Sequence, residues 1–434
     1  MRGSAIVTLL LRFRFLTFPR LSSRRERGRK AHHVRRYSSG AGRNCRPIQA
    51  RLWQGVEYVS SVSEILRGLV EIPSASSSSN RPLTEKAKAI LEKSGWICRE
   101  FPWRDANHME KLNLIATPLE QEVADEVDLA FICHTDTVPF DIKQWPSAMT
   151  LIEHDSQLHG CGACDVKGAL AGILAAISQT APEEILRSVA LILTADEEIG
   201  CLGTDRLIAA DIVRPRHVIV CEPTSLRPAC AGKGYGLAEV HISGKEAHSA
   251  FPGEGSSSIY AAAAFIHEIS AANSRLTAPV HPLFDPPHTT FNVGIIHGGR
   301  AKNIIPGECR FLVEWRPVPN EDPSTPLEWL RTLAAAMPSS GCSIEIDVRR
   351  AESGFETATD APLVRALSEL FGSEPAGISF GSEATRFARI AEEVVVIGPG
   401  DMHTAHSDRE FVPVAELNAW TDGVRRLLTR RNAF

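Results

Sequence analysis

An aliphatic run that ends in three consecutive acids constrains the fold of this chain more than any other feature. The stretch Val189–Gly200 reads VALILTADEEIG, so a short apolar segment leads directly into Asp196, Glu197 and Glu198. An apolar run of this length predicts a strand buried on both faces. In an open α/β sheet, the carboxyl end of such a strand faces the crevice where ligands bind. Because neighbouring carboxylates repel one another, the three acids indicate nearby cations or hydrogen-bond donors, although a solvated acidic turn is the alternative for a DEE segment taken alone.

Three other predicted strands also end at a histidine or an acid. Val127–Cys133 leads into His134, His217–Cys221 leads into Glu222, and Glu393–Ile397 leads into a loop that contains His406. A further acid, Asp165, lies where a glycine-rich loop changes into a small-residue helix, and a helix N-terminus favours a carboxylate. These repeated strand ends favour a ligand site over an accidental acidic turn.

The side chains collected in this way have the chemistry of a metal centre without thiolates. They are two imidazoles and four carboxylates: His134, Asp165, Glu197, Glu198, Glu222 and His406. Such a donor set suits Zn²⁺, Co²⁺ or Mn²⁺. Two histidines and three acids are enough for two ions that share one carboxylate, which leaves one acid free. Two ions roughly 3.5–4 Å apart can lower the pKa of a water to about 7 and polarise a carbonyl, so the free acid could act as a general base.

The charge of the chain is unevenly distributed. Residues 1–50 contain 13 Lys and Arg against one acid, Glu26, so they carry +12, and the net charge of −5 leaves −17 for the remainder. This acidic remainder argues against a nucleic-acid partner and tolerates a cationic substrate. The first 50 residues look like an organelle transit peptide, or like the product of a start codon placed too far upstream, and we expect them to be disordered.

The expected compartment is the cytoplasm, or an organelle matrix if the first 50 residues are a transit peptide. The chain has no apolar run of 18 residues, so we expect no membrane-spanning segment. Its ten cysteines are scattered through predicted strands and loops, which indicates reduced thiols and not a disulfide framework. The CxxC of Cys161 and Cys164 has no second CxxC or nearby histidine pair, so we expect no structural zinc there.

After about Ala231 the predicted elements change order. They read strand, helix, strand, strand, helix, strand: Gly236–Ile242, Ser257–Ile269, Phe291–Ile296, Cys309–Trp315, Pro326–Ala336 and Ser343–Val348. This order predicts a two-layer, ferredoxin-like α+β insertion with both helices on one face. The expected organisation is a terminal extension (1–50), a first catalytic part (51–230), the inserted domain (231–349) and a second catalytic part (350–434).

Seven short motifs, in the right order, resemble the acetylornithine deacetylase and succinyl-diaminopimelate desuccinylase family of co-catalytic metallohydrolases. They are HTDTVP (134–139), GCGACDVKG (160–168), TADEE (194–198), CEPTSLRP (221–228), AHS (247–249), GGxxxNxIP (298–306) and GPG…AHSDREF (398–411). The resemblance covers about residues 58–425. It implies an α/β fold in which a mixed-sheet, di-zinc aminopeptidase-like catalytic domain carries an inserted lid or dimerisation domain.

Carried over residue by residue, the resemblance implies a role for each site residue. His134 and Glu222 would bind one metal, Glu198 and His406 the other, and Asp165 both. Glu197 matches the general base, and Asp136 matches an acid that supports a ligand or the base. The metal ions implied are two per chain, most commonly Zn²⁺, with Co²⁺ possible.

Residues of the inserted domain complete the implied site. His248 matches a histidine that reaches the partner's site in a homodimer to bind the oxyanion. The residues implied to contact the substrate's carboxylate end are Lys233, Asn303 and Arg316, and arginine suits a planar carboxylate.

Within the family, the motifs around HTDTVP and EPTSLRP are most similar to the branch that removes the acetyl group from N2-acetyl-L-ornithine. The sequence departs from that branch at HSDRE and at residues 256–259, so a related desuccinylase, aminoacylase or dipeptidase is the alternative. A non-catalytic protein that keeps the fold would require a lost base or ligand, and none is lost here.

Overall fold

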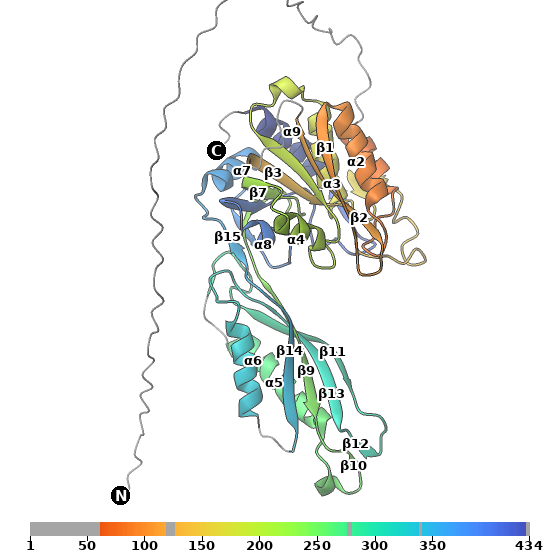
Figure 1. Ribbon diagram of the computed structural model, residues 1–434, viewed down its shortest axis with the longest axis vertical. Coiled ribbons are helices and arrows are strands. Elements are labelled where there is room, and N and C mark those ends of the chain that lie inside the picture. Colours follow the sequence, from red (N-terminus) through yellow and green to blue (C-terminus); the bar gives the residue numbers. More distant parts are fainter. Residues whose placement is uncertain (1–60, 119–125, 276–279, 338–340, 431–434) are drawn as a thin grey trace, which may run out of the picture. The chain divides into compact units, whose positions relative to one another are not determined.

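The computed structural model describes residues 61–118, 126–275, 280–337 and 341–430 (Figure 1). The terminal extension predicted for residues 1–50 lies outside this part of the chain. The described residues belong to one compact unit of the chain, which begins at Val56. Within them the cysteine thiols are free, and no helix is long and apolar enough to cross a membrane.

The largest sheet in the described part of the chain is mixed and has nine strands. Its strand order is β1-β2-β6-β3-β7-β17-β8-β15, and β16 also pairs with β8. The bounds are β1 (Trp96–Arg104), β2 (Glu110–Pro118), β3 (Glu126–His134), β6 (Val189–Thr194), β7 (Arg214–Val220), β8 (Ala229–Gly232), β15 (Phe355–Glu356), β16 (Ala376–Ile378) and β17 (Glu393–Val396). β3 is parallel to β6 and β7, and β17 is parallel to β7. The carboxyl ends of these four strands therefore lie at one edge of the sheet.

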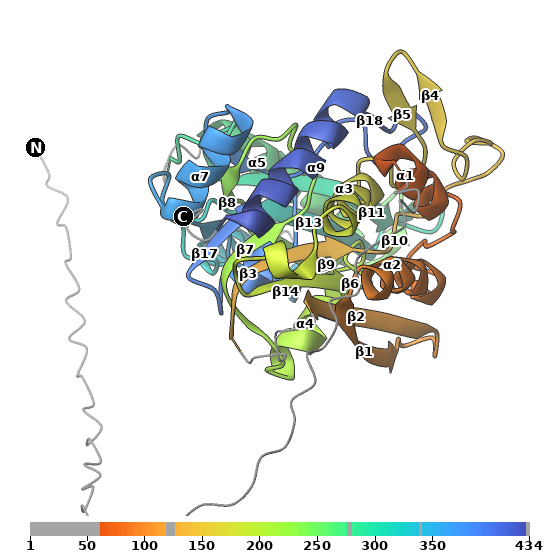
Figure 2. The ribbon, with the colours of Figure 1, turned by 90° about the horizontal axis from the view of Figure 1, so that it is seen from above.

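Helices cover both faces of this sheet. One face packs against α1 (Val62–Val70), α2 (Arg81–Lys93), α3 (Lys167–Ser178), α7 (Pro362–Phe371) and α9 (Val414–Thr429). The other face packs against α4 (Leu202–Ala209) and α8 (Ala384–Phe387). In Figure 2, α3 runs beside α9 and α1 on the first face. Because both faces are covered, the central strand β6 is buried along its whole length.

Local sequence explains where the first and third helices begin. Ser61 caps α1: its hydroxyl accepts from the backbone N–H of Glu64, whose carboxylate accepts in return from the backbone N–H of Ser61. α3 follows the Gly-rich loop that carries Asp165, and its residues Lys167–Ile177 are all buried. A helix that is apolar on every side must lie in a core, and α3 lies between α1 and α9.

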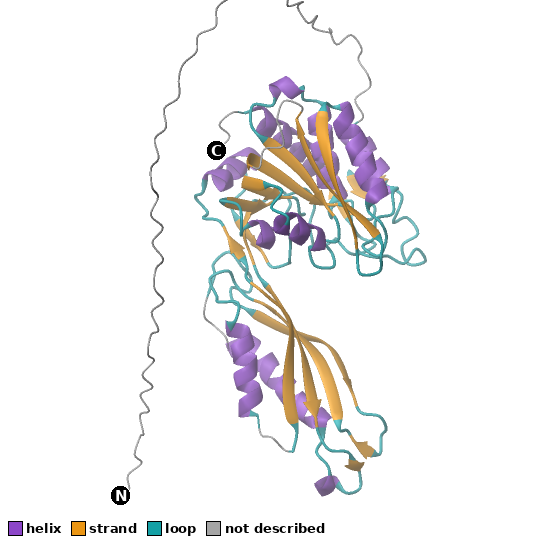
Figure 3. Cartoon of the chain, in the orientation of Figure 1, coloured by secondary structure: helices purple, strands orange, loops and turns teal. Residues whose placement is uncertain are grey.

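A second, four-stranded antiparallel sheet has the order β11-β13-β9-β14, and Figure 3 shows its two helices. Its elements are β9 (Tyr235–Ser243), α5 (Ser258–Arg275), β11 (Thr290–Gly298), β13 (Glu308–Arg316), α6 (Thr325–Ala336) and β14 (Ser343–Glu352). This is the strand and helix order that the sequence predicts. Side chains of both helices share one apolar core with the sheet. The limits 231–349 of a separate domain remain a prediction.

The remaining strands and short helices lie outside these two sheets. They are β4 (Ile152–His154), β5 (Gln157–His159), β10 (Ala247–His248), β12 (Ile304–Ile305), β18 (Phe411–Pro413), and the single 3₁₀ turns η1 (Pro182–Glu184) and η2 (Pro252–Glu254). β18, β5 and β4 form a three-stranded sheet, and β10 pairs with β12.

Candidate metal centre and active site

Asp165 contacts two histidines from different segments of the chain. One carboxylate oxygen, Oδ1, lies 3.0 Å from Nε2 of His134, which ends β3. The other oxygen, Oδ2, lies 3.0 Å from Nε2 of His406, in the loop between β17 and β18. A carboxylate that turns one oxygen towards each imidazole has the arrangement of a ligand shared by two metal ions.

Each of the two histidines also lies near a glutamate. Oε2 of Glu198 lies 3.2 Å from Nε2 of His406, and Oε1 of Glu222 lies 3.8 Å from Nε2 of His134. Ligand atoms of His134, Asp165 and Glu198 all lie within 4.8 Å of one another. Oε1 of Glu198 is buried and has no hydrogen-bond partner in the described part of the chain. Nitrogen and oxygen donors gathered around an unpartnered carboxylate oxygen fit a pair of divalent ions of the zinc type.

The ring of His134 is oriented by its other nitrogen. Nδ1 lies 3.0 Å from the backbone carbonyl oxygen of Asp136, a contact in which Nδ1 carries the hydrogen. In the neutral ring, Nε2 then holds the lone pair, and it points towards Asp165 and Glu222. Metal-binding histidines are oriented by backbone carbonyls in this way.

The pKa values of the clustered acids and histidines are shifted in ways that favour positive charge near the carboxylates. Burial by itself would raise the pKa of Asp165, but the hydrogen bonds to His134 and His406 outweigh burial and lower it. The contacts with Asp165 and Glu198 raise the pKa of His406 to about 10. Burial raises the pKa of Glu222 well above its usual value, and the charge of Asp165 adds to the shift. The clustered carboxylates thus favour positive charge on and near the two imidazoles.

Within the described part of the chain, Glu197 lies beside these groups without a hydrogen bond or ion pair to a histidine. Burial raises its pKa to about 8, and the charge of Glu198 adds to this shift while His134 opposes it. The thiol of Cys201 donates to Oε1 of Glu197 over 3.4 Å. A carboxylate whose pKa lies near neutrality can both take up and release a proton at physiological pH.

Two further acids hold the backbone of the site. Asp136 accepts from the backbone N–H of Glu197 (3.1 Å) and of Glu198 (3.3 Å), so it fixes both acids through the main chain. Glu410 accepts from three backbone N–H groups of the Gly-rich loop, those of Gly162, Cys164 and Asp165, at 3.0–3.2 Å. From the sequence we predict a supporting role for Asp136 and assign no role to Glu410. The sequence feature that points to Glu410 is its position four residues after His406.

A cavity of about 600 Å³ opens onto the metal-type residues. Its wall includes Asp165, Glu197, Glu198, Glu222 and His406 together with several cationic residues. Four of these cationic residues are Lys233, Arg316, Arg350 and Arg386. The sequence interpretation included the first two and missed the other two, because nothing in the local sequence distinguishes them from surface arginines.

The two predicted substrate-binding cations differ in their freedom to bind. The ammonium group of Lys233 donates to the carbonyl oxygens of Pro286 (3.0 Å) and His288 (2.8 Å), and the residue is almost fully buried. Arg316 stacks over the ring of Tyr235 at 4.5 Å, its Nε donates to Oε1 of Glu314 over 3.1 Å, and its side chain is about a quarter exposed. Arg316 therefore presents the more available guanidinium to a ligand in the cavity.

His248 and Asn303 lie together at the two-stranded sheet of β10 and β12. β10, which ends at His248, pairs with β12, and the carbonyl oxygen of Asn303 accepts from the N–H of Ser249 at 3.0 Å. Both side chains are exposed, and neither belongs to the wall of the 600 Å³ cavity. The described chain therefore does not bring these two residues to its own metal-type cluster.

Comparison with known proteins places this arrangement among metal-dependent peptidases. Residues 130–430 match the model of peptidase family M20/M25/M40. An acetylornithine deacetylase of Myxococcus xanthus is 41% identical over 81% of this chain and 92% of its own length. An acetylornithine deacetylase of Yersinia pseudotuberculosis (serotype O:1b) is 31% identical over 84% of this chain and 96% of its own length.

Solved structures agree on the fold. A tripeptidase from Staphylococcus aureus has a TM-score of 0.69 at 21% identity and covers 85% of this chain and 97% of its own. A dinuclear metal binding peptidase of the M20 family from Bacillus subtilis has a TM-score of 0.61 at 16% identity, with 85% and 96% coverage. The fold class predicted from the sequence is thus confirmed. The chain belongs to peptidase family M20/M25/M40 and is a hydrolase of amide bonds.

Proposed function

We propose that this enzyme removes the acetyl group from N2-acetyl-L-ornithine and releases L-ornithine and acetate. The observation that carries the proposal is the complete cluster at the sheet edge, in which Asp165 contacts His134 and His406 while Glu197 stays free of both. The substrate is supported by the two bacterial relatives that carry the name acetylornithine deacetylase.

The ligand assignment follows the contacts around Asp165. His134 and Glu222 would hold one ion, Glu198 and His406 would hold the second, and Asp165 would contribute to both. Imidazole and carboxylate donors suit Zn²⁺, with Co²⁺ as a substitute. When bound, such ions acidify a water molecule and polarise the carbonyl of the amide.

Glu197 is the proton carrier of the reaction. It takes a proton from the water that attacks the acetyl carbon, and it returns this proton to the nitrogen of ornithine as the C–N bond breaks. The backbone contact with Asp136 keeps Glu197 in place, and the thiol of Cys201 limits the rotation of its carboxylate. Arg316 is positioned to bind the carboxylate of the amino acid through a planar, two-point contact. Lys233 and Asn303 are the other proposed contacts at that end of the substrate.

The proposed assembly is a homodimer formed through the inserted sheet, in the cytoplasm. β11 is an edge strand on which Ile295 and Ile296 are each 49% exposed, and Tyr260 on α5 is 80% exposed. A second cavity of about 690 Å³ lies between α5 and the β10–β12 pair. An unpaired edge beside exposed apolar side chains suits a second copy of the chain. In that dimer, His248 of one chain would stabilise the oxyanion in the site of its partner.

Kinetics on a substrate panel test the proposed function. Purified protein loaded with Zn²⁺ or Co²⁺ is assayed on N2-acetyl-L-ornithine, N-succinyl-diaminopimelate, N-acetyl-L-methionine and dipeptides. We expect kcat/KM for acetylornithine to exceed the others by at least about tenfold, since one unsatisfied polar contact costs this much. A higher kcat/KM for another member of the panel would assign the enzyme to that substrate and contradict the proposal.

A further inference from the structure

A fully buried ion pair lies directly beside the catalytic acids. Nζ of Lys111, the second residue of β2, lies 2.6 Å from Oδ1 of Asp196, and both side chains are 0% exposed. Asp196 directly precedes Glu197 in the chain. Neither member of this pair has a role in the chemistry proposed above.

The ammonium group of Lys111 also binds a second segment. It donates to the backbone carbonyl oxygens of Ser76 (2.6 Å) and Ser78 (2.8 Å), in the loop that leads to α2. An ammonium group has three donors, and each has one acceptor here. Lys111 therefore joins the loop around Ser76 to the loop that carries the catalytic acids.

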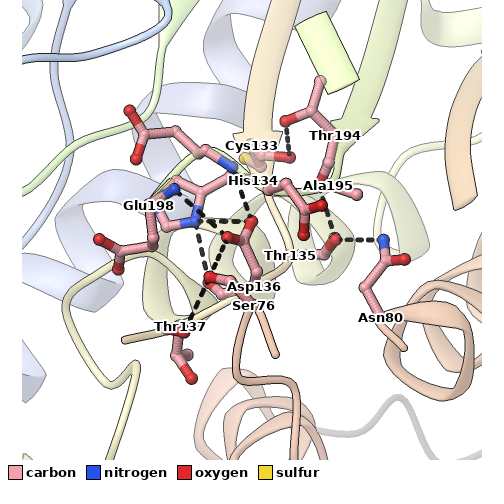
Figure 4. A network of polar contacts seen from close by, with 12 residues as sticks. Ser76, Asn80, Cys133, His134, Thr135, Asp136, Thr137, Thr194, Ala195 and Glu198 are labelled. Carbon is pink, nitrogen blue, oxygen red and sulfur yellow. Dashed lines mark hydrogen bonds and ion pairs between the residues drawn. The ribbon is translucent and has the colours of Figure 1, made fainter. Parts of the chain in front are cut away.

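The loop around Ser76 in turn contacts the backbone of the two glutamates. The hydroxyl of Ser76 donates to Oδ2 of Asp136 over 2.7 Å, and Asp136 accepts from the N–H groups of Glu197 and Glu198. Figure 4 shows Ser76 and Asp136 in this network beside His134. We call Lys111, Asp196, Ser76 and Asp136 the lysine clamp. It reaches the acid-bearing loop from two directions, through Asp196 and through Asp136.

The conformation of Asp196 explains why this loop needs support. Its φ is +59°, a left-handed value that L-residues adopt less readily than glycine, although aspartate tolerates it better than most. A buried ion pair adds little net stability compared with a well-packed apolar pair, because both charges lose their hydration. The pair is therefore better explained by the geometry that it imposes than by the stability that it adds.

We propose that Lys111 is a positioning residue of the active site, which holds the backbone of Glu197 and Glu198 in the arrangement needed for proton transfer and metal binding. Lys111 touches neither the substrate nor the metal ligands' side chains. The activity part of this inference rests on the proposed function, whereas the part that concerns Glu198 can be tested by metal binding alone.

The test compares Lys111→Met, the double variant Lys111→Met/Asp196→Asn, and a control, Arg187→Met. Methionine keeps the length of the side chain and removes the charge and the donors. The double variant avoids an unpaired buried carboxylate, so it should regain melting temperature that the single variant loses. Arg187 also has a buried side chain (4% exposed) paired with a carboxylate, that of Asp128, but this pair lies near the start of β3, at the opposite end from His134.

For both Lys111 variants we expect kcat to fall by about 100-fold with little change in KM, the size of loss that a small misplacement of catalytic groups produces. Zn²⁺ affinity, measured by calorimetry on the metal-free protein, should fall by about 10-fold or more for the ion bound by Glu198. Arg187→Met should keep both values within about twofold even if its melting temperature falls. Restoring stability in the double variant should not restore kcat.

Two outcomes would overturn the inference. The first is that the double variant has the kcat and the Zn²⁺ affinity of the wild-type protein. The second is that kcat and Zn²⁺ affinity fall as far in the Arg187→Met control as in the Lys111 variants. If the wild-type enzyme does not hydrolyse acetylornithine, the proposed function fails. The Zn²⁺ measurements would still decide whether Lys111 positions Glu198.

Discussion

Asp165 is the single side chain on which both proposed metal positions depend. Its two oxygens each lie 3.0 Å from a different imidazole, and it is 4% exposed. We therefore predict that Asp165→Asn loses both ions, because the amide presents one oxygen and no charge to two cations. Metal content after dialysis measures the outcome. Asp408→Asn, which changes an exposed acid in the His406 loop, should keep two ions per chain. An Asp165→Asn protein with full metal content would contradict the shared-ligand assignment.

The adjacent acids Glu197 and Glu198 should respond differently to the same substitution. Glu198 contacts His406 at 3.2 Å, whereas Glu197 has its hydrogen bond from Cys201. We predict that the Glu197→Gln protein binds metal normally but that its kcat falls by about 10²–10⁴-fold, the usual contribution of a general base. Glu198→Gln should lose metal affinity as well. Equal metal occupancy and equal activity in the two variants would show that this division of roles is wrong.

Several of the residues that sequence reasoning found follow strands closely, whereas Asp165 and His406 lie in loops. His134 ends β3, the acids follow β6, and Glu222 comes two residues after β7, so the sheet brings them together whatever the loops do. Lys111 and Glu410 could not be found in this way. Lys111 lies near the start of β2, and it meets Asp196 only because β2 pairs with β6. Contacts of this kind depend on which strands pair, and the residues around Lys111 in the sequence do not reveal that pairing.

The close contact between α3 and α9 depends on a glycine. A Cβ at Gly172 would lie 2.4 Å from Cδ1 of Trp420. The indole cannot move away, because it is fully buried, donates to the carbonyl oxygen of Ala169 (2.9 Å) and stacks on Phe371. We predict that Gly172→Ala destabilises the protein by about 1–3 kcal/mol, since this steric cost exceeds alanine's advantage of about 1 kcal/mol within a helix.

Chemical denaturation measures this prediction against Gly253→Ala. A Cβ at Gly253 has no heavy atom within 4 Å, so the change should stay within about 0.5 kcal/mol. A Gly172→Ala protein as stable as the control would mean that α3 and α9 can separate without cost.

The sequence pattern predicts β9, whereas β1 and α9 are not among the predicted elements. β9 alternates strictly between buried and half-exposed positions, which is the period-two pattern of a sheet covered on one face. β1 has only one fully buried residue, Trp96, and reads as a polar segment because it lies at the edge of the sheet. α9 follows the His406 loop without a side-chain cap at its start. Its burial depends on contacts with α3 that lie about 250 positions away in sequence.

For the whole molecule, the position of His248 makes the assembly testable. Its side chain is exposed on β10 and lies outside the cavity wall that contains Glu197 and the metal-type residues. A histidine that stabilises the oxyanion must therefore reach that cavity by movement of its own inserted sheet or from a second chain. The exposed edge strand β11 offers a surface on which a second chain could pair.

Mixed dimers separate these two routes. We combine a Glu197→Gln chain with a His248→Ala chain, each inactive alone, and purify heterodimers through two different affinity tags. If His248 serves the partner, one site of each heterodimer contains an intact Glu197 together with an intact His248 of the other chain, and about half of wild-type activity per dimer should return. The control combines Glu197→Gln with Glu198→Gln. Since both changes affect a chain's own cluster, no site in that heterodimer is complete and no activity should return. If purified heterodimers of the first kind also stay inactive, His248 acts within its own chain or has no part in the reaction.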